Sequence, residues 1–236
     1  MTGDSNLMTS MVSWLPALLQ GTVVTVQISL GAFAIGLLIG FPVALIKLKA
    51  GPAWVRLANG YTSVCRSVPE LLLILLLYYA GADLINRISL ALGGETVEIN
   101  GFAAAVVVLG IVQGAYVAEI MRGAILAIPF GQIEAARALS MSPLLYTRRI
   151  IIPAMAPYAL GGLSNLWLIL IKDSALISVV GYSELLYTAK QAAGTSKHYF
   201  LFYLLAAAIY LCITVASSAL FQVADRRMSR WIPAHH

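Results

Sequence analysis

Five long apolar runs, separated by shorter polar segments, constrain this chain more than any other feature of its sequence. Each run reaches or exceeds the roughly 20 residues that a helix needs to cross about 30 Å of hydrocarbon. Because a bilayer offers backbone groups no water, each run must satisfy its hydrogen bonds internally, which favours helices. The sequence therefore predicts an all-α integral membrane protein: a single transmembrane domain, residues 1–236, with five transmembrane helices. The runs are Leu18–Ile46, Trp54–Tyr79, Phe102–Ile128, Ile151–Leu170 and Tyr199–Val223.

A sixth apolar stretch, Ala175–Val180, is too short to span and is followed by Gly181. Two interpretations remain open: a re-entrant segment, or a continuation of the helix before it. Composition excludes a soluble fold, since 60% of the 236 residues are hydrophobic and only 11% are charged. A soluble domain of this size has no core large enough to bury that much apolar surface.

Basic residues orient the chain, because the cytoplasmic loops of membrane proteins retain Lys and Arg. The first 46 residues contain neither. Ten basic residues follow run one, lie around the loop between runs three and four, or follow run five: Lys47, Lys49, Arg56, Arg122, Arg137, Arg148, Arg149, Arg226, Arg227 and Arg230. The opposite side has Arg87, Lys190 and Lys197. We therefore predict an external amino terminus and a cytoplasmic carboxyl terminus. This bias, not nucleic-acid binding, explains the net charge of +5.

Motifs of catalysis are missing from the sequence. No Gly-x-x-x-x-Gly-Lys-Ser/Thr phosphate loop occurs, so any nucleotide hydrolysis has to come from another polypeptide. No nucleophile with an adjacent base and no metal-ligand spacing is visible either. We expect this chain to have no catalytic residue, no metal site and no cofactor of its own.

The segment between runs three and four, about residues 129–150, is too polar to span and too apolar for a linker. Pro129 ends the incoming helix, and strong helix formers then follow over Gln132–Leu139, up to Ser142-Pro143. The pattern predicts a short interfacial helix. On that helix Ile133, Ala136 and Ser140 share one stripe, and Glu134 and Arg137 are close enough to pair beside it.

The same segment carries a family motif. The pattern is Glu134-Ala135-Ala136, then Ser140 after three residues, Ile150 after nine more, and Ile152-Pro153 after one more. It resembles the EAA signature of permease subunits in bacterial ATP-binding-cassette (ABC) importers. That signature usually has Gly at position 140 and Leu at position 152. The resemblance implies a type I ABC importer permease fold, in which this loop is the coupling helix that docks into a cleft of a separate ATPase. The implied ATPase-coupling residues are Glu134, Ala135, Ala136, Arg137, Ser140, Ile150 and Pro153.

A second resemblance narrows the class. The stretches Gly114–Gly123, Arg66–Leu71 and Leu170–Leu176 resemble those of permeases for polar amino acids, such as histidine, lysine, arginine, ornithine and opines. This implies a location in the bacterial inner membrane and several partners. They are a sister permease (a paralogue is favoured over a second copy), an ABC ATPase dimer that binds ATP and Mg, and a substrate-binding protein. No nucleic acid is implied.

Ionisable residues within apolar runs are costly and tend to mark a pathway. Arg66 and Glu70 are four residues apart and share a helix face, so they either neutralise each other or line a substrate pathway. Pro69 frees a carbonyl one turn earlier, which opens the helix near Glu70 and favours a ligand role for its carboxylate. Glu119 and Arg122 are expected to pair and to position the coupling loop.

Asn165 and Lys172 are seven residues apart and lie on nearly the same helix face. Together with Asp173 and Ser174 they are predicted to line one wall of a polar cavity, where Asp173 takes the ammonium group and Lys172 the carboxylate of an amino acid. The alternative for this set is mutual salt bridging and capping at the helix end. Acidic residues at membrane depth favour cationic amino acids or opines as the substrate.

An ion-coupled secondary amino acid transporter is the alternative function. Buried charges are compatible with it, because such charges serve to couple ions. Five runs without a visible inverted repeat count against it, and so does a coupling-helix motif that such a transporter would not need.

Overall fold

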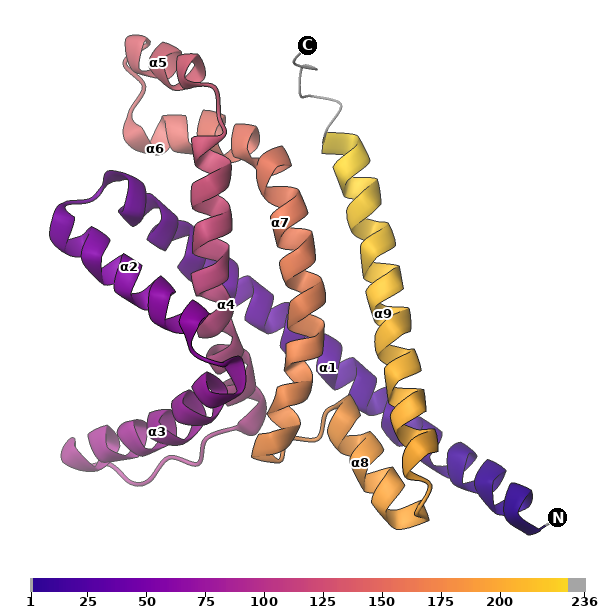
Figure 1. The fold of residues 1–236 in the computed structure, drawn as a ribbon. Helices are drawn as coiled ribbons and strands as arrows, with labels where there is room; N and C mark the ends of the chain where they lie inside the picture. The colour runs from indigo at the N-terminus through magenta and orange to yellow at the C-terminus, as the bar shows by residue number, and fades with distance from the viewer. Residues whose placement is uncertain (1, 229–236) are drawn as a thin grey trace.

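The computed structural model describes residues 2–228, and its regular structure over that range is entirely helical (Figure 1). The elements are α1 Thr2–Lys49, α2 Pro52–Ser67, α3 Glu70–Ala91, α4 Gly101–Leu126, α5 Phe130–Ala138, α6 Pro143–Tyr146, the π-helix η1 Thr147–Ile151, α7 Ile152–Asp173, the 3₁₀ helix η2 Ser174–Val180, α8 Leu185–Ser196 and α9 Tyr199–Met228.

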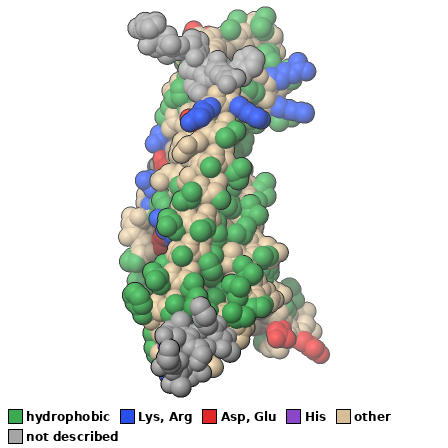
Figure 2. Space-filling model, turned by 90° about the vertical axis from the view of Figure 1, so that its right-hand side faces the viewer, with side chains coloured by type: hydrophobic (Ala, Val, Ile, Leu, Met, Phe, Trp, Pro, Cys, Tyr) green, Lys and Arg blue, Asp and Glu red, His purple; other side chains and the backbone are tan. Residues whose placement is uncertain are grey.

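Five helical segments are long and apolar enough to cross a membrane, which confirms the predicted all-α class and number of spans. They are Ser10–Lys49, Glu70–Ala91, Gly101–Leu126, Pro143–Val180 and Tyr199–Met228. Large apolar side chains such as Leu38, Leu211 and Leu220 are more than half exposed, as expected for a surface that faces lipid. Figure 2 shows hydrophobic side chains over the middle of one face, while Lys and Arg gather near one end. Arg230 lies outside the described residues.

The second run was predicted wrongly as one continuous helix over Trp54–Tyr79. Helix α2 ends at Ser67, and α3 begins at Glu70. Between them Val68 has an extended backbone and Pro69 a non-helical one, with φ −53° and ψ 130°. Proline lacks the donor N–H and disfavours helical geometry at the residue before it, so the chain breaks here. The two helices diverge as a V (Figure 1), and the candidate span is α3.

The short stretch after run four proves to be a continuation of the preceding helix. Helix η2, Ser174–Val180, follows α7 without a gap and ends at Gly181, whose φ is 84°. A left-handed backbone of this kind is strained for side chains other than glycine, which explains the stop. The re-entrant interpretation is therefore wrong.

Helix α1 crosses behind the other helices and packs most extensively on α4 (Figure 1). Glycines make this close approach possible: a Cβ atom added at Gly40 would lie 2.5 Å from Val117 Cγ1, and one at Gly110 would lie 2.5 Å from Ile35 Cγ2. Small residues commonly mediate helix packing in membranes, where van der Waals contact is a main driving force.

A buried carboxylate joins three helices at one end of the molecule. Glu184, fully buried before α8, accepts hydrogen bonds from Leu186 N at 2.8 Å, Tyr187 N at 2.7 Å, Thr25 Oγ1 of α1 at 3.3 Å and Tyr210 OH of α9 at 2.9 Å. Burial raises the pKa of this carboxyl above its usual range, and the four donors act against burial. Glu184 is thus both the N-cap of α8 and its attachment to α1 and α9.

Replacing Glu184 by alanine should lower the free energy of unfolding by about 1–3 kcal/mol, because buried donors on three helices lose their acceptor. The melting temperature of the solubilised protein measures this. Glu184→Gln, which keeps one oxygen, should fall between alanine and wild type. Glu98→Ala, at an exposed position, is the matched control. If Glu184→Ala has the same melting temperature as Glu98→Ala, Glu184 does not join the three helices.

Candidate functional site

A polar cleft opens between α2, α4 and α7. It consists of two cavities of about 220 Å³ and 450 Å³ that share Arg66, Tyr116 and Glu119. The smaller cavity reaches Asn165 on α7, and the larger one extends along α2 to Lys47 on α1. The smaller cavity has a mainly apolar lining, whereas the larger one is mainly polar. A hydrophilic depression among membrane helices is the expected form of a pathway for a polar solute.

Glu119 lies at the centre of a charged cluster in this cleft. Its Oε1 accepts a hydrogen bond from Lys47 Nζ, and its Oε2 accepts one from Arg122 Nε at 3.0 Å. Lys47 Nζ also contacts Thr62 Oγ1 at 2.5 Å, and the lysine side chain is only 5% exposed. The predicted Glu119–Arg122 pair is present, but Lys47 was assigned to a polar loop and is instead a buried partner.

Arg66 does not pair with Glu70, contrary to one of the two interpretations. Among the ion pairs of residues 2–228 none joins these side chains, because the break at Val68-Pro69 places them on different helices. The Arg66 guanidinium lies instead over the ring of Tyr116, 5.9 Å from its centroid. A cation held by an aromatic face keeps its N–H groups available to an anion.

Acidic groups approach Tyr116 as well. The carboxyl group of Glu70 interacts with both Tyr116 and Asp173. Gln113 Nε2 donates to Asp173 Oδ2 at 3.3 Å, while Gln113 Oε1, in a side chain 1% exposed, has no hydrogen-bond partner among the described residues. The arrangement offers a guanidinium for a carboxylate and two carboxyls with an amide oxygen for an ammonium group.

The predicted wall of Asn165, Lys172, Asp173 and Ser174 does not form as one surface. Asn165 lines the smaller cavity, whereas Lys172 lines a separate groove of about 390 Å³ beside Tyr203 and Tyr210. Seven residues of helix separate the two side chains by about 10 Å along the axis, so a shared face does not bring them together. Ser174 is buried and donates to Ile171 O at 2.7 Å, which is a local cap.

Three residues of this region were not predicted from the sequence: Lys47 and Tyr116 line the cleft, and Gln113 contacts Asp173. Lys47 was missed because it ends an apolar run, and Tyr116 because it was considered only as part of a motif. Gln113 gave a usable signal: it is an amide in the middle of an apolar run, where an unsatisfied polar group is costly.

The coupling segment forms the predicted helix, here α5, Phe130–Ala138. Ala136 is 1% exposed and packs in a core with Tyr146, Ile151 and Met155, while Glu134 and Ala135 are exposed. The helix thus has one face fixed to the protein and one face free. The side chain of Arg137 lies outside the described residues, so its predicted pairing stays a prediction.

The ends of the motif have distinct structural positions. Ile150 packs against the same core, and Pro153 stands exposed in the first turn of α7, where proline is well tolerated. Ser140 was predicted to share the stripe of Ile133 and Ala136, but α5 ends at Ala138 and Ser140 is exposed in the turn beyond.

Ser140 has a left-handed backbone with φ 53°. Met141 N donates to Ala136 O at 3.2 Å, the long bond of a Schellman turn, and Met141 packs on the core of Ala136. Glycine is the usual residue at this point of such a turn, which explains why the motif usually has Gly at position 140.

The sequence is similar to those of known transport proteins. The family described as binding-protein-dependent transport system inner membrane component matches residues 32–230. The octopine transport system permease protein OccQ of Rhizobium radiobacter is 39% identical over 218 residues, which cover 92% of this chain and 92% of that protein. The histidine/lysine/arginine/ornithine transport system permease protein HisQ of Salmonella typhimurium is 34% identical, with 90% and 93% covered.

The structure is similar to solved transporters. An amino acid ABC transporter solved with histidines superimposes with a TM-score of 0.77 at 34% identity, covering 93% of this chain and 97% of that chain. The inward-facing MetNI methionine ABC transporter gives a TM-score of 0.67 at 21% identity, covering 88% and 95%, and supports the fold alone. These similarities confirm the expected ABC importer permease fold.

Ser140→Gly should stabilise the protein by about 1 kcal/mol, because glycine adopts the left-handed backbone without strain. For a chain of this size we expect the melting temperature to rise by about 2–4 °C. Ser142, two residues on, has φ −62° and no side-chain cap, so Ser142→Gly should give no gain. Equal effects of the two substitutions would contradict a strained Ser140.

Proposed function

This chain belongs to the family of binding-protein-dependent transport system inner membrane components, and on that premise we propose that it translocates cationic amino acids or opines as the permease subunit of an ATP-driven importer. The relatives OccQ and HisQ carry octopine and histidine/lysine/arginine/ornithine transport in their names. The observation that carries the substrate class is the set of charges around Tyr116. Arg66 lies over its ring in the cleft, and the acidic residues Glu70 and Asp173, which do not line the two cavities, interact with it. The family match gives no support to the ion-coupled alternative.

The two kinds of charge fit the two ends of such a substrate. The Arg66 guanidinium suits the α-carboxylate, because its fork of donors matches carboxylate geometry. Glu70 and Asp173 suit an ammonium or guanidinium group. A cationic amino acid brings a positive side chain as well as its α-ammonium group, and these two positive charges relieve the repulsion between the two neighbouring carboxyls. A neutral amino acid satisfies only part of this arrangement.

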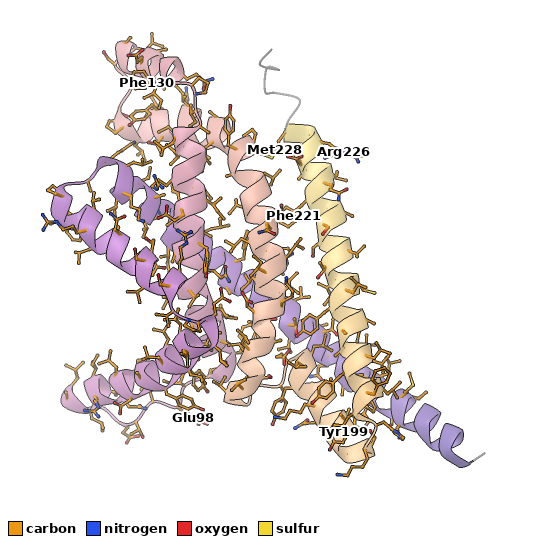
Figure 3. All side chains as sticks on the ribbon, viewed as in Figure 1. Glu98, Phe130, Tyr199, Phe221, Arg226 and Met228 are labelled. Atoms are coloured by element: carbon orange, nitrogen blue, oxygen red, sulfur yellow. The ribbon has the colours of Figure 1, made fainter. Side chains whose placement is uncertain are left out.

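The end of the molecule where Lys and Arg gather indicates how the chain is oriented across the membrane. In Figure 3, Phe130 of α5 and Arg226 of α9 lie toward the same end, whereas Glu98 and Tyr199 lie toward the other. We assign the first end to the cytoplasm on the positive-inside rule. The amino terminus is then external, the carboxyl terminus is cytoplasmic, and α5 lies where a soluble ATPase can reach it.

Coupling to the ATPase uses the free face of α5. Ala136 holds the helix to the core, so a push on exposed Glu134 and Ala135 moves the core of the permease with it. ATP and Mg bind on the ATPase dimer, whose closure supplies the force, and the bundle alternately opens the cleft to each side of the membrane. A binding protein delivers the amino acid from outside.

A sister permease completes the pathway. Asn59, Ser63 and Ser67 form an exposed polar face of α2 along the larger cavity. Polar side chains at membrane depth face protein or a water-filled cavity rather than lipid. A paralogous permease or a second copy of this chain is the proposed cover for that face.

Glu134→Lys should abolish ATP-dependent uptake while membrane insertion stays normal, because the substitution reverses charge on the free face of α5 without touching its buried side. Uptake of labelled arginine into proteoliposomes that contain the whole complex measures this. Glu95→Lys, an exposed charge reversal in the segment between α3 and α4, is the control. Normal uptake by the Glu134 variant would refute the coupling role.

Glu70→Gln should reduce uptake of lysine or arginine by about tenfold, the cost of losing one hydrogen bond to a charged group. Assembly with the partner subunits should not change. Asp83→Asn removes an exposed carboxylate that pairs with Arg87 on the same span, and it should leave uptake intact. If Glu70→Gln transports like Asp83→Asn, Glu70 has a structural role only.

A further inference from the structure

The last turn of α1 is tied to the segment that follows α5. Lys49 Nζ donates to Tyr146 OH at 2.6 Å and lies 4.6 Å from the centroid of the same ring. Lys49 is the last residue of α1, and Tyr146 is the last residue of α6. Lys49 is exposed, so this contact can break and re-form at small cost.

Tyr146 shares a core with the coupling helix. It is 7% exposed and belongs to the same buried cluster as Ala136, against which Leu45 and Leu48 of α1 also pack. A displacement of α5 therefore reaches the end of α1 through direct packing as well as through the Lys49 contact. Packed cores respond to such displacement by switching arrangement rather than by stretching.

The same turn of α1 also holds the cleft. Lys47, two residues before Lys49, contacts Glu119 of α4 and Thr62 of α2, and all three line the larger cavity with Arg66. Unlike Lys49, Lys47 is buried, so loss of its partner would leave an uncompensated charge. One helix end thus touches both the coupling segment and the wall of the cleft.

We propose that the carboxyl-terminal turn of α1 is the transmission element of the permease: Lys49 and Tyr146 pass the movement of α5 to α1, and Lys47 passes it to Glu119 at the cleft. The proposal rests on the proposed ATPase coupling and deepens it. The π-helix η1 begins directly after Tyr146, and π-helical turns often accompany functional adjustments of a helix.

The first experiment uses the complete complex of this chain with its sister permease, ATPase and binding protein in proteoliposomes. Lys49→Met keeps the apolar stem of the lysine, and Tyr146→Phe keeps the ring in the core. Both should raise the ATP hydrolysed per arginine transported by at least about fivefold, a typical allosteric coupling factor. The double variant should be no worse than either single variant. Lys190→Met, an exposed lysine of α8, should behave as wild type.

The second experiment separates transmission from structural support. Lys47→Met and Glu119→Gln should each lower the melting temperature. The double variant removes both charges of the buried pair and leaves only Arg122, whose side chain is 39% exposed, without its carboxylate, so it should recover the part of the loss that comes from an unpaired Lys47. If this turn transmits movement, Lys47→Met raises the ATP hydrolysed per arginine transported, and the recovered double variant keeps that raised ratio. A purely structural pair predicts that the wild-type ratio returns together with the melting temperature.

Each outcome decides between the claims. A wild-type ratio of ATP to arginine in both Lys49→Met and Tyr146→Phe overturns the transmission element, even if their melting temperatures fall. If the ATPase does not co-purify with the wild-type permease at all, the proposed function fails instead. An increased ratio in both variants, with the ATPase still bound, supports the proposal.

Discussion

The close packing of α1 on α4 is the contact on which the rest of the structure depends. Glycines such as Gly40 and Gly110 let the two backbones approach, and without a hydrophobic driving force in lipid this van der Waals fit holds the pair together. The consequence is functional as well as structural. Helix α4 presents Tyr116 and Glu119 to the cleft, and α1 brings Lys47 to Glu119.

The coupling helix and the cleft are parts of one packed body. The core that fixes Ala136 of α5 extends through Tyr146 to α1 and α7, and it includes Leu166, which also lines the smaller cavity. A short surface helix with one buried alanine is thus connected to the cleft by direct packing, without a dedicated linker. The small side chains of the motif suit this arrangement, since a bulkier residue at 136 would have no space in the core.

Hydropathy and motif spacing predicted the architecture well, because spans and helix stops are local properties of the sequence. The interfacial helix was placed within two residues of its observed start, Phe130. The stop at Ser142-Pro143, inferred from proline chemistry, was wrong: α5 ends at Ala138, and Pro143 is the first residue of α6. The same chemistry at Pro69 was underestimated: it was expected to loosen a helix, and it ends one. Side-chain partners were harder to predict, since Lys47 meets Glu119 only after two distant helices pack.

The V formed by α2 and α3 has one more consequence. Val68 and Pro69 are both non-helical, so the angle between the two helices can vary like a hinge without breaking any hydrogen bond inside either helix. Arg66 is one residue from the end of α2, and Glu70 is the first residue of α3. A swing of α3 therefore changes the separation between the guanidinium of Arg66 and the carboxyl of Glu70, while the secondary structure of both helices stays intact.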